Sequence, residues 1–205
     1  FYTPEGKPYY DLISGVSVSN VGHANPVVVE AVQRQAAEYM HVMVYGEYAQ
    51  GPAVEYCKLL ASLLPPQLSK TYLVNSGTEA TEGALKLARR ATGRTQLISC
   101  RNAYHGNTMG SMSVMEHEER KKPFLPLIPD VDFIDFNNEA DIQKISTKTA
   151  GIILESIQGG AGFIQPENNF LKKVKERCEE VGALMIIDEI QPGFGRTGKL
   201  FGFEN

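Results

Sequence analysis

Three short groups of residues have types and spacing that could do chemistry together. The first, Ser76-Gly77-Thr78, stands where an apolar segment passes into a predicted helix. Free backbone N–H groups, the helix dipole and a glycine that allows close approach make such a turn a binding site for one phosphate. The alternative is an ordinary serine N-cap, which this motif taken alone favours.

The second and third groups follow other apolar segments. Asp188 ends the run 183–187, so its carboxylate should be partly desolvated and needs a partner, either a protonated ring nitrogen of a cofactor or an arginine. Tyr104, in Tyr104-His105-Gly106, could stack on a planar cofactor or belong to the core. A phosphate turn, a stacking ring and a terminal aspartate are together what pyridoxal 5′-phosphate requires.

Other motif matches in the chain lack the sequence context that their functions require. Residues 193–198 match G-x-G-x-x-G, but no helical pattern follows them, as a dinucleotide-binding turn requires. With Lys199 the same stretch imitates the phosphate loop of nucleotide hydrolases, but Leu200 stands where Ser or Thr should hold magnesium. The histidines also lack metal-ligand spacing, so no metal site is predicted.

The elements that must position these groups alternate along the chain. Apolar periodicity and end signals predict helices over residues 26–40, 51–64, 76–93 and 170–182. Short apolar runs predict strands over residues 70–75, 95–100, 131–136, 149–157 and 183–188. This order predicts an α/β fold with a mostly parallel sheet covered by helices, and functional groups just past the carboxyl ends of the strands.

Composition narrows the class of protein further. The chain has 205 residues, 42% of them hydrophobic, which suits one good-sized domain or a large part of a bigger one. Its net charge of −4 does not favour binding to nucleic acid, and no apolar run is long enough to span a membrane. Three widely spaced cysteines, Cys57, Cys100 and Cys178, fit a reducing cytoplasm.

Several motifs resemble the class III aminotransferases, in order and over essentially the whole chain. They are Gly22-His23-x-x-Pro26, residues 75–80, residues 104–106, Glu155-x-x-Gln158-Gly159 and residues 187–198. The resemblance implies the type I pyridoxal-phosphate fold. Residues 1–45 would lead into the large domain, and residues 46–205 would form part of it, with the C-terminal small domain missing. The chain thus looks cut from a longer one.

The resemblance also implies a role for each cofactor-binding residue. Ser76, Gly77 and Thr78 would hold the phosphate, and Asp188 would act as the catalytic residue by pairing with the pyridinium nitrogen. The remaining contacts would come from residues around the ring: Tyr104 and Ile190 on its two faces, Gln191 at the 3-oxygen, and His105 and Glu155 nearby. The Schiff-base lysine of the family is not expected in this chain, because Lys199 does not match it.

Three positions depart from the family pattern. Members that bind ornithine, acetylornithine or 4-aminobutyrate usually have Arg where this chain has Asn107, and Glu where it has Gly160. Ornithine transaminases have Tyr at the position of Val16. These substrate-site residues point away from those donors, since asparagine cannot supply the planar bidentate grip of an arginine.

The resemblance implies transfer of an amino group between an amino acid or ω-amine donor and a 2-oxo acid, by a cytoplasmic homodimer that binds neither nucleic acid nor membrane. Two alternatives stay open. One is amino-acid racemisation on the same scaffold, and the other is a truncated, non-catalytic module for cofactor binding or dimerisation.

Overall fold

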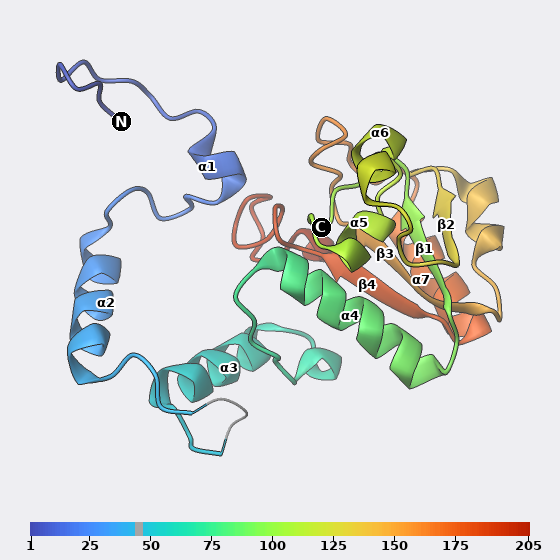
Figure 1. Cartoon of the computed structure of the whole chain (residues 1–205), viewed down its shortest axis with the longest axis horizontal. Helices are drawn as coiled ribbons and strands as arrows, with labels where there is room; N and C mark the ends of the chain where they lie inside the picture. Colours follow the sequence, from blue (N-terminus) through green and yellow to red (C-terminus); the bar gives the residue numbers. More distant parts are fainter. Residues whose placement is uncertain (44–46) are drawn as a thin grey trace. The chain divides into compact units, whose positions relative to one another are not determined.

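The computed structural model describes residues 1–43 and 47–205, which form two compact units (Figure 1). The sheet unit comprises Phe1–Asn20 and Asn75–Asn205, and the helical unit comprises Val21–Val74. The domain boundary predicted between residues 45 and 46 falls outside the described residues.

The sheet unit is built on four parallel strands. They are β1 (Gln96–Cys100), β2 (Val131–Ile134), β3 (Thr149–Glu155) and β4 (Leu184–Asp188), in the order β2-β1-β3-β4. All seven residues of β3 are buried, as expected for a central parallel strand with both faces covered. The predicted α/β class and parallel sheet are confirmed.

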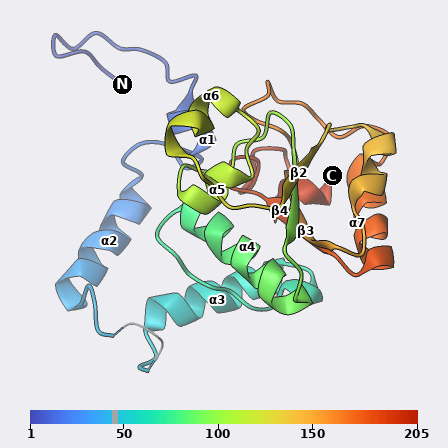
Figure 2. The ribbon, with the colours of Figure 1, turned by 45° about the vertical axis from the view of Figure 1, so that its right-hand side comes forward.

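Two helices cover opposite faces of this sheet, α4 (Gly77–Thr92) and α7 (Phe170–Val181) (Figure 2). Successive strand residues point to opposite faces, so Ile98 packs in the cluster that contains Phe170 of α7. Its neighbour Leu97 packs with Leu85 of α4. The sheet core therefore consists of two apolar layers, one beneath each helix.

The ends of α4 follow from its sequence. The N–H of Glu79 donates to Ser76 Oγ at 3.3 Å, so Ser76 is an N-cap. Gly93 ends the helix with a φ of +69°, a conformation that favours glycine. The predicted helices over 76–93 and 170–182 are confirmed, and so are four of the five predicted strands.

Short helical segments complete the sheet unit. They are α1 (Ser14–Ser17), α5 (Met109–Ser113), α6 (Glu118–Lys121), η2 (Lys122–Phe124), η3 (Glu139–Lys144) and η4 (Gly202–Glu204). None of them carries a strong periodic signal in the sequence, because helices of three to six residues are too short to show one.

The helical unit contains α2 (Pro26–Glu38), α3 (Gly51–Leu63) and η1 (Pro66–Leu68), and both predicted helices are confirmed. Asn25 caps α2 by accepting the N–H of Val27 at 3.0 Å, and Pro26 occupies the first helical position. No residue of α2 or α3 is buried in the described structure. Several of their apolar side chains, among them Val27, Val32 and Leu59, are exposed.

The strand predicted over residues 70–75 is wrong. This segment has no regular secondary structure, and Tyr72 and Leu73 are exposed. A strand needs a hydrogen-bonded neighbour, and none of the described strands pairs with it. An apolar run was therefore insufficient evidence for a strand here. Among the described helices, none combines the length and apolar character needed to cross a bilayer.

Candidate functional site

The carboxyl ends of β1, β3 and β4 lie side by side and carry most of the predicted site residues. Tyr104 and His105 follow β1, Glu155 ends β3, and Asp188 ends β4 directly opposite Glu155 in the strand register. Parallel strands place their carboxyl ends at one edge, which is where open α/β sheets bind ligands. Ser76 was also expected to follow a strand, but the structure has no strand over residues 70–75.

Asp188 is buried and held by two N–H groups. Its Oδ2 lies 2.8 Å from Nδ1 of the buried His105, and its Oδ1 accepts the N–H of Ile190 at 3.0 Å. The protein partner of the carboxylate is thus a histidine and not the arginine considered as an alternative. A carboxylate can only accept, so the hydrogen of this contact lies on His105 Nδ1, and within the described residues His105 Nε2 has no hydrogen-bond partner.

Glu155 joins two of the loops at this edge. Its carboxylate accepts the N–H of Tyr104 at 3.3 Å and the N–H of Gly159 at 2.9 Å. Burial raises the pKa of the Glu155 carboxyl, although the Gly159 hydrogen bond and the nearby His105 act in the opposite direction. Glu155 therefore holds the backbone of Tyr104 in place through the Tyr104 N–H.

The first turn of α4 reaches the same edge. A Cβ on Gly77 would lie 2.7 Å from Cδ1 of Ile190. The start of the helix therefore lies against Ile190, two residues after Asp188 at the end of β4. A Cβ on Gly159 would overlap Oε1 of Gln191, which places that amide against the loop after β3. The predicted residues at 77, 190 and 191 are thus brought to one edge.

Thr78 packs against the loop that carries Tyr104 and His105. Gly106 has a φ of +124°, and a Cβ there would overlap Thr78 Oγ1, so both backbone conformation and space require glycine. Thr78 Oγ1 lies 2.8 Å from both Thr108 Oγ1 and Ser111 Oγ. Ser76, in contrast, is exposed and its hydroxyl serves as the helix cap.

The three predicted substrate residues have different surroundings. A Cβ on Gly160 would lie 3.6 Å from Tyr104 Cβ, so this glycine lies next to Tyr104 and has room for a Cβ. Asn107 is exposed. Val16 is also exposed, with a φ of +61°, in the N-terminal segment that Asn20 ties to the loop after β4 by donating to the Phe194 carbonyl at 2.6 Å.

The sequence reasoning missed several polar residues close to this edge. Glu82, Thr108 and Ser111 form a hydrogen-bonded cluster behind Thr78. Glu189 accepts the N–H groups of Gly202 at 2.5 Å and Phe203 at 3.1 Å, which fixes the last segment of the chain. Two signals were available: Glu82 follows Thr78 by one helical turn, and Thr108-x-x-Ser111 has the spacing of a capping box.

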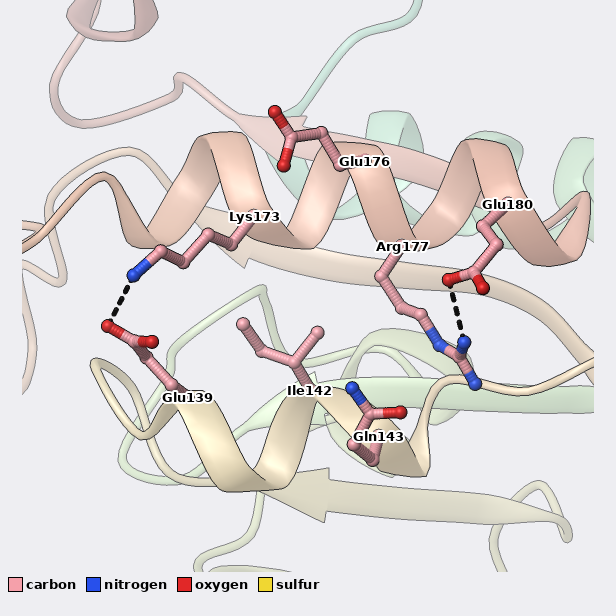
Figure 3. Close-up of a pocket in the computed structure, with 7 residues that line it drawn as sticks. All are labelled: Glu139, Ile142, Gln143, Lys173, Glu176, Arg177 and Glu180. Carbon is pink, nitrogen blue, oxygen red and sulfur yellow. Dashed lines mark hydrogen bonds and ion pairs between the residues drawn. The ribbon is translucent and has the colours of Figure 1, made fainter.

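A separate groove of about 450 Å³ lies between η3 and α7, lined by Glu139, Ile142, Gln143, Lys173, Glu176, Arg177 and Glu180 (Figure 3). Its charges are largely satisfied: Lys173 pairs with Glu139 at 2.5 Å and Arg177 with Glu180 at 2.7 Å. It contains none of the predicted site residues. Among the described residues, no group of three His, Cys, Asp or Glu side chains is placed to hold a metal ion.

Comparison with known proteins agrees with this arrangement. The family described as Aminotransferase class-III matches residues 1–205. The chain is 41% identical over 202 residues to an acetylornithine aminotransferase from Methanopyrus kandleri, covering 98% of this chain and 51% of the relative. It is also 41% identical, over 201 residues, to a LysW-aminoadipate semialdehyde/glutamate semialdehyde transaminase from Sulfolobus acidocaldarius, with the same coverage of each.

A solved structure shows the same fold. The taurine:2-oxoglutarate aminotransferase from Bifidobacterium kashiwanohense, in complex with pyridoxal phosphate and glutamate, superposes with a TM-score of 0.88 at 31% identity. The match covers 100% of this chain and 51% of that one. The chain thus spans about half the length of the relatives it matches. With a family match over its whole length, the chain belongs to the class III aminotransferases.

Proposed function

We propose that the full-length protein is a pyridoxal-phosphate-dependent aminotransferase that moves an amino group between an amine or amino-acid donor and a 2-oxo acid. The observation that carries the proposal is the position of Asp188: a buried, hydrogen-bonded carboxylate at the same sheet edge as the first turn of α4. A phosphate at the helix and a pyridinium at the carboxylate account for both features.

The residues present fit this cofactor. The first N–H groups of α4 have no partner within the helix, and the Ser76 cap satisfies that of Glu79, which leaves Gly77 and Thr78 to bind phosphate oxygens. Each carboxylate oxygen of Asp188 already accepts one N–H, and a carboxylate can accept about four hydrogen bonds in all. One acceptor position can therefore take a ring N–H.

Pyridoxal phosphate, when bound, supplies an electron sink for the negative charge that forms at the α-carbon of the substrate. In our proposal Asp188 keeps the proton on the ring nitrogen, and the N–H groups of His105 and Ile190 keep its carboxylate oriented. Tyr104 and Ile190 are 48% and 55% exposed, so both offer apolar surface to the two faces of the ring. Gln191 is proposed to reach the 3-oxygen.

The relatives named above are aminotransferases. They support amino transfer over racemisation and over a non-catalytic module. For the donor, we propose a compound that does not depend on an arginine at position 107 or a glutamate at position 160 for carboxylate binding.

We also propose a cytoplasmic homodimer. The exposed apolar residues of α2 and α3, including Val32 at 63% and Leu59 at 58%, support an additional covering surface, for which we propose a second copy. Free cysteines at positions 57, 100 and 178 support a reducing compartment.

The replacement Asp188→Asn in the full-length protein tests the proposal. We expect the variant to lose turnover by at least about a hundredfold, because asparagine cannot hold the ring proton as a charged acceptor. The matched control is Asp132→Asn on β2, an exposed aspartate that accepts Gln96 Nε2 at 2.7 Å. Unchanged amino transfer in Asp188→Asn, or production of a D-amino acid without a 2-oxo acid, would overturn the proposal.

A further inference from the structure

Glu82, one turn into α4, lies at the centre of a polar cluster behind the proposed phosphate turn. Its Oε1 accepts the hydroxyl of Thr108, the N–H of Gly110 at 2.7 Å and the N–H of Ser111 at 3.2 Å. One carboxylate thus holds the start of α5 against α4. Hydrogen bonds to a charged acceptor are among the stronger ones in a protein.

Gly110 is adapted to this carboxylate. A Cβ at position 110 would overlap Glu82 Oε2, although the glycine has no positive φ that would explain its presence. Glu82 and Gly110 therefore fit together as a pair, and a side chain at position 110 would push the carboxylate out of place.

The cluster extends from Glu82 to Thr78. Because Thr108 donates its single hydroxyl hydrogen to Glu82, its Oγ1 accepts in the contact with the Thr78 hydroxyl at 2.8 Å. The Ser111 hydroxyl, which has one hydrogen, can then donate to Thr78 Oγ1 at 2.8 Å. The N–H of Thr108 donates to Ser111 Oγ at 3.0 Å and to Thr78 Oγ1 at 3.3 Å. The Thr78 hydroxyl is thus engaged within the protein, and its backbone N–H is the group left to face a ligand.

We propose that Glu82 is a positioning residue for the cofactor phosphate: through Thr108 and Ser111 it fixes Thr78, and so aims the first N–H groups of α4. The inference rests on the proposed function but adds a residue that touches neither phosphate nor ring. A role in stability alone would weaken the binding of every ligand alike. A role in positioning weakens only the part of the affinity that the phosphate supplies.

The test compares two ligands in the full-length protein, pyridoxal phosphate and pyridoxal, which lacks the phosphate. Dissociation constants are measured by titration for the wild type, Glu82→Gln and Thr108→Val. The second variant removes the hydroxyl that joins Glu82 to Thr78 and keeps both the Glu82 bonds to the α5 backbone and the Ser111 contact with Thr78. It is therefore informative even if Glu82→Gln does not fold. Glu179→Gln is the control, since this glutamate is exposed on α7 and its ion pair with Lys175 is long, at 3.8 Å.

We expect both variants to weaken pyridoxal phosphate about tenfold or more and pyridoxal by less than about twofold, with the control unchanged. Equal losses for the two ligands, or no loss for either, would overturn the inference. A wild-type protein that binds neither ligand would instead overturn the proposed function itself, so the two failures are distinguishable.

Discussion

Two adjacent glycines in the loop after β3 are expected to behave differently. A Cβ at Gly159 would overlap the Gln191 amide, whereas a Cβ at Gly160 would make only ordinary contact with Tyr104. We therefore expect Gly159→Ala to displace Gln191 and weaken pyridoxal-phosphate binding several-fold, while Gly160→Ala leaves binding nearly unchanged. Titration of both variants with the cofactor checks this. Equal affinities would show that Gln191 does not contact the cofactor.

The burial of Glu155 predicts that the stability of the protein depends on pH. Its pKa is raised by burial above the ordinary value of 4.5, so its contribution to stability is present while it is protonated and is lost as pH rises through the raised pKa. Glu155→Gln stays neutral at every pH. We therefore expect the free energy of unfolding of the variant, minus that of the wild type, to increase as pH rises above about 4.5.

Urea unfolding of both proteins across a pH series measures this difference. Glu179→Gln, which removes an exposed carboxyl from α7, serves as the matched control and should not reproduce the slope. A difference that decreases as pH rises would contradict the proposed effect of burial on Glu155.

We also expect donor specificity to depend on single residues. With Asn107 in place of arginine, we expect a donor that is bound through its α-carboxylate to lose a bidentate contact worth on the order of 2–5 kcal/mol, which is roughly 30-fold or more in kcat/KM. We expect ornithine and acetylornithine to be poor donors, and Asn107→Arg to improve them. A panel with 4-aminobutyrate, β-alanine, lysine and simple amines measures this. Ornithine or acetylornithine as clearly the best donor would refute it.

At the scale of elements, α7 depends on one buried aromatic residue. Phe170 has no exposed surface and makes an edge contact with Phe136, with ring centroids 5.2 Å apart. We expect Phe170→Ala to lower the free energy of unfolding by about 3–5 kcal/mol, because it leaves a cavity under the helix. Lys172→Ala, at an exposed position of the same helix, should cost less than about 0.5 kcal/mol. Similar losses in the two variants would contradict the packing described.

At the scale of the whole molecule, the prediction concerns association. The groove of about 450 Å³ between α2 and α3 is lined mainly by apolar side chains, among them Val32, Tyr39 and Met40. We expect the full-length protein to sediment as a dimer, and Val32→Glu to raise the dimer dissociation constant at least about tenfold by placing a charge in an apolar interface. The control is Lys172→Glu on α7. A monomeric wild-type protein would contradict the homodimer.

The sequence was informative wherever the signal is local. Periodicity and end signals located α2, α3, α4 and α7, and apolar runs located all four strands, because these features depend on neighbours within about a turn or a pleat. Motifs at strand ends, such as Asp188 and Glu155, could also be proposed as site residues, since parallel strands share one functional edge. The segment 70–75 shows the limit of this reasoning, because a strand exists only if another strand pairs with it.

Only the tertiary structure decided which groups meet. The sequence left the partner of Asp188 open, and the fold supplies His105, 83 residues away, because β1 and β4 lie on either side of β3. That strand order is not contained in the alternation of helices and strands. The Glu82 cluster is a similar case: its partners come from α5, 28 and 29 residues further on, and a short helix has too little pattern to reveal where it packs.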